Sequence, residues 1–257
     1  MKKKKNKPGK SPAKKPKATV SVLPAPTPGK KQVLQVVLGK RDEHGGLHSR
    51  FHNDSWEEIC AEILPSKDLT KNHDVSTLTQ LPSGRFDAVW CIHTLEFFFI
   101  HHIPALLKIF QRILKPGGYL FATTPDLQKA AEKLYRNGAD VTLYGTKIAP
   151  ISALDIIYGL RPNLQKQPET TLHRCGYSAG MLGRTLKEAG FHDIKVQRDG
   201  YRLWAIAHHR PDLAGQEAKL TIQGPDINEI MQKRDNIDQE PNQWKGFPPK
   251  DDKPAKK

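Results

Sequence analysis

Three apolar runs of the sequence end in residues that can bind or react with a small molecule. Leu38-Gly39 closes a run that starts at Val33, Glu62-Ile63 lies near the end of a second run, and Cys91-Ile92-His93 closes a third. A glycine after a strand lets the backbone approach a ligand closely, because it has no Cβ. A carboxylate can accept hydrogen bonds from two neighbouring hydroxyl groups, and an imidazole can take a proton from a hydroxyl or an amine.

Each of these residues also has a purely structural explanation. Gly39 fits a simple turn after a strand, Glu62 fits an exposed strand end, and His93 fits a residue that only lines a cavity. His101-His102 has the look of a metal-binding pair but lacks suitably spaced partners, so we predict an exposed helix start and no metal site. The three cysteines show no Cys-x-x-Cys spacing, which argues against a zinc site and against a disulfide framework.

The elements that would position these residues alternate between strand and helix. Continuous apolar runs typical of buried parallel strands occupy residues 33–38, 59–64, 86–92 and 119–124. Apolar residues from Ile100 to Leu114 recur at i, i+3 and i+4, which predicts an amphipathic helix. We expect Lys115 in its last turn and Pro116-Gly117-Gly118 as its end.

Further helices and a hairpin follow in the second half of the chain. Helices are predicted at 126–137, 152–158 and 178–189, with Ser152 and Ser178 as N-caps of the last two. Strands at 194–198 and 201–207 are predicted to pair across the turn Asp199-Gly200. This order describes an open α/β sheet with helices on both faces, whose ligands bind outside the carboxyl ends of its strands. The three run ends therefore meet around one crevice.

The charge of the chain is concentrated at its N-terminus. The formal net charge is +14, and residues 1–31 contain eleven lysines and no acidic residue. We predict a disordered basic tail at 1–31, a folded domain at 32–210, and a mostly disordered charged tail at 211–257 with a short helix at 226–234. The segment Lys2–Lys17 is expected to bind nucleic acid weakly and without sequence preference, or to act only as a solubilising extension.

Targeting features are absent from the sequence. No apolar run is long enough to cross a bilayer, and no apolar segment of a signal peptide follows the first lysines. We therefore expect a cytoplasmic protein in a reducing compartment, with no membrane partner.

Several segments together resemble one enzyme superfamily. Phe86-Asp87-Ala88-Val89-Trp90, Leu95-Glu96 and Leu114-Lys115-Pro116-Gly117-Gly118-Tyr119-Leu120 resemble the signature of class I S-adenosylmethionine-dependent methyltransferases. A bacterial, type 11-like subgroup is resembled by Pro125-Asp126-Leu127-Gln128, Tyr158-Gly159-Leu160-Arg161-Pro162, His173-Arg174-Cys175-Gly176-Tyr177 and Leu203-Trp204-Ala205. The resemblance spans about Val33 to His208. It implies an α/β, Rossmann-like three-layer sandwich with a mostly parallel seven-stranded sheet and an antiparallel closing strand.

The same resemblance implies the cofactor and its contacts. S-adenosylmethionine would place its ribose at Glu62 and its methionine part at the residues after Cys91. The candidate cofactor contacts are Leu38, Gly39, Glu62, Ile63, Cys91, Ile92 and His93, and His93 is also the candidate catalytic base. Tyr158, Arg161, His173 and Arg174 are candidates for the acceptor pocket, with a packing role as the alternative.

The sequence departs from the family pattern at three points. Val36-Val37-Leu38-Gly39-Lys40 keeps one glycine where members usually show Gly-x-Gly, no acid precedes Leu81-Pro82, and Phe97 replaces a usual histidine. The favoured function is methyl transfer to an unidentified nucleophilic acceptor. Two alternatives stay open: a non-catalytic methyltransferase-like binding module, and a nucleic-acid-associated protein that acts through its basic tail.

Overall fold

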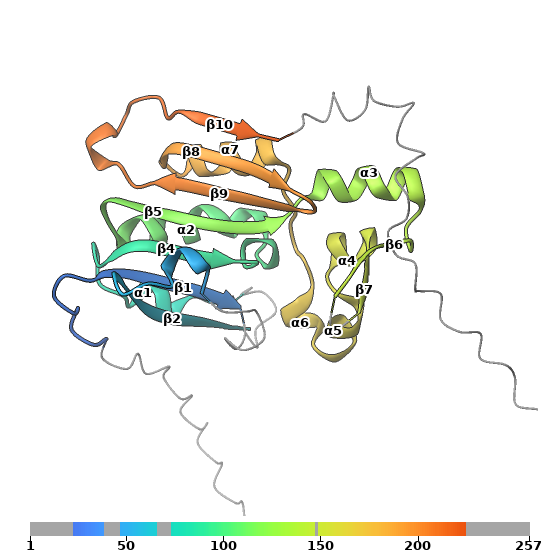
Figure 1. The fold of residues 1–257 in the computed structure, drawn as a ribbon, viewed down its shortest axis with the longest axis horizontal. Coiled ribbons are helices and arrows are strands. Elements are labelled where there is room, and N and C mark those ends of the chain that lie inside the picture. The colour runs from blue at the N-terminus through green and yellow to red at the C-terminus, as the bar shows by residue number, and fades with distance from the viewer. Residues whose placement is uncertain (1–22, 39–46, 66–72, 147–148, 225–257) are drawn as a thin grey trace, which may run out of the picture. The chain divides into compact units, whose positions relative to one another are not determined.

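The computed structural model describes residues 23–38, 47–65, 73–146 and 149–224 (Figure 1). Three of the sequence-based predictions fall outside these residues: the contact at Gly39, the cationic segment Lys2–Lys17 and the helix at 226–234. They stay predictions.

Strands and helices alternate along most of the described chain. The strands are β1 (Lys31–Leu38), β2 (Trp56–Pro65), β3 (His73–Asp74), β4 (Phe86–Ile92), β5 (Leu114–Pro125), β6 (Thr142–Gly145), β7 (Pro150–Ser152), β8 (His192–Asp199), β9 (Arg202–His208) and β10 (Leu220–Gln223). The α-helices are α1 (Ser76–Thr79), α2 (Ile103–Ile113), α3 (Leu127–Asn137), α4 (Ala153–Tyr158), α5 (Arg161–Lys166), α6 (Pro168–Thr171) and α7 (Ala179–Glu188). Short 3-10 helices are η2 (Ser49–Phe51), η3 (Leu95–Phe97), η4 (Ile100–His102) and η5 (Pro211–Leu213).

Eight of these strands form one mixed sheet in the order β10-β8-β9-β5-β4-β1-β2-β3. The strands β2, β1, β4 and β5 are parallel to their neighbours in this order, and β9 runs antiparallel between β5 and β8. The predicted Rossmann-like α/β class, with a mostly parallel sheet and an antiparallel closing strand, is confirmed. The sheet has one strand more than expected, because β10 pairs in parallel with β8 at the edge.

The strand register brings the ends of the parallel strands to one edge. Val37 of β1 lies opposite Glu62 of β2, and Val36 lies opposite Cys91 of β4. Figure 1 shows helices α4, α5 and α6 beyond this edge, in the insert between β5 and α7. The insert therefore stands where a ligand of the sheet would bind.

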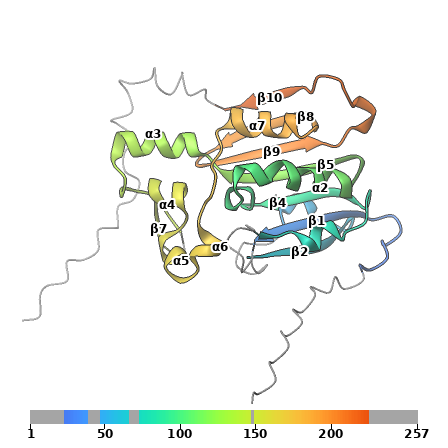
Figure 2. The same cartoon turned by 180° about the vertical axis from the view of Figure 1, so that it is seen from behind.

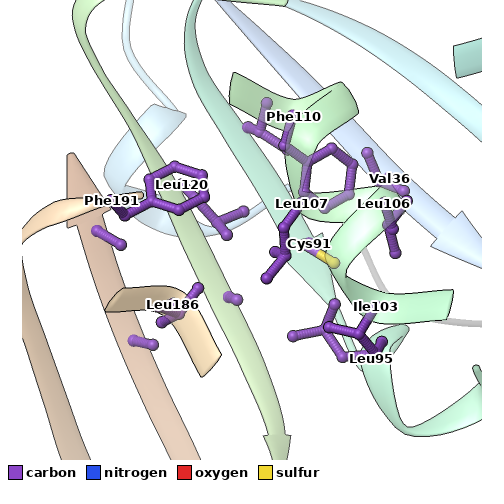
Figure 3. Packing of buried hydrophobic residues seen from close by; sticks show 14 of the residues in the cluster. Val36, Cys91, Leu95, Ile103, Leu106, Leu107, Phe110, Leu120, Leu186 and Phe191 are labelled. Atoms are coloured by element: carbon purple, nitrogen blue, oxygen red, sulfur yellow. The ribbon is translucent and has the colours of Figure 1, made fainter. Parts of the chain in front are cut away.

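The main core lies between the sheet and helices α1, α2 and α7. Figure 2 shows α2 and α7 on the same side of the sheet. The apolar face of α2, with Ile103, Leu107 and Phe110, packs against buried strand residues such as Cys91 and Leu120 (Figure 3). This periodicity is the one that predicted the helix.

The opposite face of the sheet differs from the expected helical layer. In the described part of the chain, this face carries a second core of Val33, Ala88, Trp90 and Phe121 that is covered by the residues around η2. Phe51 of η2 is buried there. All described α-helices that pack on the sheet contribute to the first core instead.

The helix that precedes β5 ends earlier than predicted. α2 ends at Ile113, and Arg112 is the basic residue of its last turn. Lys115, which we expected in that turn, lies in β5 and donates a hydrogen bond from Nζ to Asp87 Oδ2 at 2.8 Å. The reason is that Leu114 already pairs with Phe86 of β4, so sheet pairing begins before the Pro-Gly-Gly segment.

Both predicted tail boundaries need correction. In the segment before β1, which we expected to be disordered, Leu23 packs against the core and the Pro24 carbonyl accepts a hydrogen bond from Arg85. Thr27 Oγ1 donates to Glu57 Oε1 at 3.1 Å. At the other end the folded part continues past residue 210 to Gln223, because Leu220 of β10 packs on the core. These segments are short and of mixed composition, so a prediction from composition alone did not detect their contacts.

The contacts before β1 yield a prediction on truncation. A chain that starts at Lys31 loses the packing of Leu23 and the hydrogen bonds of Pro24 and Thr27, whereas a chain that starts at Leu23 keeps them. We expect about 1–2 kcal/mol lower stability, or roughly 2–8 °C in melting temperature, for the shorter chain. Thermal unfolding of both chains checks this, and equal melting temperatures would contradict it.

The predicted caps of α4 and α7 are confirmed. The helix α3 also begins where predicted, and there Asp126 accepts hydrogen bonds from Gln128 N and Lys129 N. Ser152 and Asp155 form a reciprocal capping box on α4, and Ser178 accepts from Met181 N on α7. The insert and α7 therefore begin where the sequence indicated.

Candidate functional site

The candidate site lies where β4 ends, at the carboxyl edge of the sheet. His93 directly follows β4, and its φ of 39° is one of two positive φ values among described residues other than glycine. Its backbone N–H donates to the Thr123 carbonyl of β5 at 3.0 Å. A left-handed conformation costs free energy for an L-residue, so the surrounding bonds hold His93 in a strained position.

A buried carboxylate holds the His93 ring. Nδ1 of His93 lies 3.0 Å from Oε1 of Glu96, and the side chains are 33% and 1% exposed respectively. Burial alone would raise the pKa of the Glu96 carboxyl, but the hydrogen bond from His93 and the charges that His93 and His173 can carry lower it below its usual value. With Glu96 ionised, Nδ1–H of His93 donates to it, and Nε2 of the half-exposed ring is left to face other groups.

The last segment of the insert is bonded to the backbone of Glu96. The Glu96 backbone carbonyl accepts from Arg174 N at 2.7 Å and from Cys175 N at 3.1 Å. The ring of His173 lies 5.1 Å from that of Phe97, centroid to centroid, and its Nδ1 bonds the Ile156 carbonyl at 2.9 Å. Burial lowers the pKa of His173, against the opposing charge of Glu96, so this imidazole is neutral at pH 7. Residues 93–97 and 173–175 thus form one cluster.

Two thiol groups and one hydroxyl group near this cluster are unreactive at neutral pH. Burial raises the pKa of the Cys175 thiol to about 11, and the thiol lies 3.3 Å from the Leu95 carbonyl. Burial also raises the pKa of the Tyr177 hydroxyl and of the Cys91 thiol. None of them is a nucleophile at neutral pH, because the thiolate or phenolate is disfavoured.

One oxygen of the cluster is unsatisfied. Within the described residues, Oε2 of Glu96 is buried and has no hydrogen-bond partner. A buried carboxylate oxygen without a donor is costly, and such atoms mark positions that another group occupies. A bound molecule with an N–H or O–H group would satisfy it.

The cofactor candidates divide into core and edge residues. The side chains of Leu38, Ile63 and Cys91 are fully buried in the main core, so they can offer a ligand only their backbone. Ile92 is half-buried and lies in the second core, whereas Glu62 is exposed on β2 beside the end of β1. Of the described candidates, only Ile92, Glu62 and His93 therefore present side chains outside the main core.

The acceptor candidates divide in the same way. His173 and Arg174 join the Glu96 cluster, and the guanidinium of Arg174 lies 5.6 Å above the Phe99 ring. Arg161 instead makes a bidentate pair with Asp155 at 2.9 and 3.0 Å, although half of its side chain is exposed. This pair and the hydrogen bonds from Ser152 lower the pKa of Asp155 to about 2, against the effect of burial. Tyr158 is exposed on α4.

Glu96 is the residue that sequence reasoning missed. It was part of a recognised segment but was not singled out as a site residue. The available indication was an acid within the apolar run Leu95-Glu96-Phe97-Phe98-Phe99, because a charge in such a run needs a polar partner.

Searches for other kinds of site are negative for the described residues. They contain no group of three or more His, Cys, Asp or Glu side chains placed to hold a metal ion. His101 stacks on Phe99 at 5.7 Å between centroids. No described helix has the length and apolar character needed to span a bilayer.

Comparisons with known proteins point to one family. A family model described as a methyltransferase domain matches residues 44–196, which is more than half of the chain. No curated protein matches the chain.

Solved structures give weaker similarities. A SAM-dependent methyltransferase from Archaeoglobus fulgidus is 13% identical, with 70% of this chain and 86% of that chain covered and a TM-score of 0.38. The 1,6-didemethyltoxoflavin-N1-methyltransferase of Burkholderia thailandensis, solved with its substrate and S-adenosylhomocysteine, is 14% identical over 71% and 72% of the two chains, with a TM-score of 0.41. A SAM-dependent methyltransferase from Methanosarcina mazei is 10% identical over 71% and 93%, with a TM-score of 0.38. At such values only the domain match carries weight.

Proposed function

The chain belongs to the methyltransferase-domain family, and we propose that it binds S-adenosylmethionine at the carboxyl edge of its sheet and transfers the methyl group to a nucleophilic acceptor. The observation that carries this proposal is the Glu96 cluster, with its buried carboxylate oxygen that lacks a donor. The match of residues 44–196 to a methyltransferase domain supports the choice of cofactor.

The described residues fit such a ligand. The exposed carboxylate of Glu62 can accept hydrogen bonds from the ribose hydroxyls, and Oε2 of Glu96 can accept one from the ammonium group of the methionine part. The backbone at Leu38 and the side chain of Ile92 would line the space between them. When bound, S-adenosylmethionine supplies a methyl group that is already activated by its sulfonium charge, so the protein needs to supply alignment and exclusion of water.

His93 is the proposed base that acts on the acceptor. Its Nδ1 is engaged by Glu96, so its Nε2 can take the proton that a hydroxyl or amine acceptor loses. The ionised Glu96 stabilises the imidazolium that results and fixes the orientation of the ring. His173 and Arg174, in the same cluster, are the groups best placed to contact the acceptor.

A non-catalytic binding module is the second candidate. The observation in its favour is Leu38, which replaces a family glycine at the end of β1 and is buried in the main core. A ligand could still bind at this edge without being held in a reactive position. The tail-based alternative rests on Lys2–Lys17, outside the described residues.

Calorimetric titration with S-adenosylhomocysteine tests the proposal. We expect the full chain to bind it, and Glu62→Ala to weaken binding by about 10- to 150-fold, because a hydrogen bond to a charged group contributes about 1.5–3 kcal/mol. Glu188→Ala removes an exposed carboxylate from α7, away from this edge, and should leave the affinity unchanged.

The outcomes separate the candidates. No heat of binding from a protein that is folded by circular dichroism would reject the proposed cofactor. Binding that Glu62→Ala leaves intact would keep the cofactor but reject the placement of its ribose. Binding without methyl transfer to any hydroxyl, amine or carbon acceptor would favour the binding module.

A further inference from the structure

A hollow lies on the face of the sheet opposite α2 and α7. It measures about 310 Å³ and lies over the strands β5, β9, β8 and β10. Its lining includes Phe121, Trp204 and His48 on one side, and Lys195, Gln197 and Asp199 on the other. Pockets that hold a small molecule or one unit of a polymer begin at about 300 Å³.

One wall of the hollow is aromatic. Trp204 stacks on Trp90, with ring planes 8° apart, and its ring centroid lies 5.5 Å from that of Phe121, with ring planes 30° apart. His48 packs edge-on against both Trp204 and Phe121. Trp204 is half-buried, so part of this stack is open to the hollow. Aromatic stacks with an exposed member bind flat rings by offset stacking.

The other wall is polar and exposed. Lys195, Gln197 and Asp199 alternate along β8 and point to the face that carries Trp204, because Ile194 and Val196 pack into the main core. Gln197 pairs in register with Trp204 on the neighbouring strand. An amide and a carboxylate therefore stand beside the aromatic wall, where they can bind the donors and acceptors at the edge of a ring. A lysine stands two residues further along.

The His48 ring adds a donor to the same hollow. Its Nδ1 accepts a hydrogen bond from Arg50 N at 3.1 Å, so Nε2 carries the proton of the neutral ring. Burial, together with the positive charge of Arg50, lowers the pKa of His48, which keeps the ring neutral at pH 7. The guanidinium of Arg50 lies over the Tyr119 and Phe121 rings at 5.5 and 5.8 Å, so a cation borders the aromatic wall as well.

We propose that this hollow binds a base of single-stranded nucleic acid. A base would stack on Trp204, its edge would bond Gln197 and Asp199, and Lys195 would contact an adjoining phosphate. Aromatic side chains on an open sheet face bind unpaired bases in this manner, since a base inside a duplex cannot reach them. Lys195 and Arg50 place two cations at this hollow against the one carboxylate of Asp199, which favours an anionic ligand over a neutral ring compound. An amino-bearing base such as adenine suits the amide and carboxylate pair.

Fluorescence anisotropy of a labelled single-stranded oligoadenylate tests this on the full chain. We expect Trp204→Ala to weaken binding by about tenfold or more through the loss of stacking. Lys195→Glu changes only an exposed residue and should weaken binding by about three- to tenfold. Lys108→Glu is the matched control, because it makes the same charge change on α2, on the opposite face of the sheet. The lysine-rich N-terminal segment is present in every variant, so its contribution cancels.

Each outcome decides for or against the hollow. Weaker binding by Lys195→Glu than by Lys108→Glu supports the proposal, even where Trp204→Ala fails to fold. Equal affinities for wild type, Lys195→Glu and Lys108→Glu would overturn it and assign binding to other cations. Adenosine monophosphate that binds as tightly as the oligonucleotide would overturn the choice of partner, because the hollow would then hold a free nucleotide. Titration with S-adenosylhomocysteine is independent of these variants and keeps the two sites apart.

Discussion

Replacement of Gly159 by alanine should destabilise the insert strongly. Gly159 caps α4 with φ 107° and ψ 158°, a conformation that is almost exclusive to glycine. A Cβ at this position would lie 2.2 Å from the Thr171 carbonyl oxygen, so backbone would have to move. We expect a loss of about 3 kcal/mol or more in the free energy of unfolding, from strain and overlap together.

The consequence should reach the candidate site. The Tyr158 carbonyl, directly before Gly159, accepts a hydrogen bond from His173 N at 3.0 Å, and the Ile156 carbonyl bonds the His173 ring. Displacement of Thr171 therefore shifts the segment that covers Glu96.

Urea denaturation of Gly159→Ala and Gly200→Ala separates the cost of backbone strain from the cost of atomic overlap. Gly200 also has a positive φ, of 57°, but a Cβ there meets nothing within 4 Å, so alanine should cost only about 1–2 kcal/mol. Equal losses for both variants would show that the overlap at Thr171 is relieved without cost.

The starts of helices could be predicted from sequence, because they depend on interactions between residues close together in the chain. Ser152 and Ser178 cap helices where predicted, since a cap depends on the next three residues only. The end of α2 could not be placed in this way. Leu114 pairs with Phe86, and a pairing partner 28 positions away leaves no mark in the local pattern.

The carboxyl edge of the sheet, where the candidate site is proposed, could also be predicted, because the strand-end rule depends on topology alone. The side chains that face the site could not. Leu38, Ile63 and Cys91 lie within continuous apolar runs. Such runs do not show which side chains point toward the helices. Glu96 escaped for a different reason. Its backbone is held by Arg174 and Cys175 across the whole insert, so its burial is a tertiary property.

The face of the sheet opposite α2 and α7 is where the structure differs most from the fold predicted from sequence. Helices were predicted on both faces of the sheet, but the described residues between β1 and β2 form only η2, whose Phe51 is buried on this face. A helical layer there would cover the aromatic side chains of Trp90, Phe121 and Trp204. Their stack borders an open hollow instead, which no period in the sequence distinguishes from a covered core.

Glu96→Gln should weaken ligand binding about as strongly as Glu62→Ala. Glutamine keeps the shape of the side chain but removes the charge that pairs with His93 and with the ammonium of the proposed cofactor. We expect about 10- to 150-fold weaker binding of S-adenosylhomocysteine at pH 7. Stability should fall, because the lowered pKa of Glu96 shows that its contacts with His93 and His173 more than offset the cost of burying its charge.

The pH dependence distinguishes a charge effect from a packing effect. The pKa of Glu96 is lowered in the folded protein, so its charge, and any stability it confers, is present above the usual pKa of a glutamate and is lost as the pH falls through the lower folded value. The difference in affinity between wild type and Glu96→Gln should therefore persist down to about pH 5 and shrink only in stronger acid.

Glu132→Gln is the matched control, because Glu132 is another buried acid, held by Lys129 and Arg136 on α3. It should leave the affinity for S-adenosylhomocysteine unchanged at all pH values. If Glu96→Gln binds as tightly as wild type, the unsatisfied oxygen of Glu96 does not face the cofactor, and the carboxylate only orients His93. If both variants lose affinity equally, the loss comes from a general disturbance of the structure and not from the charge of Glu96.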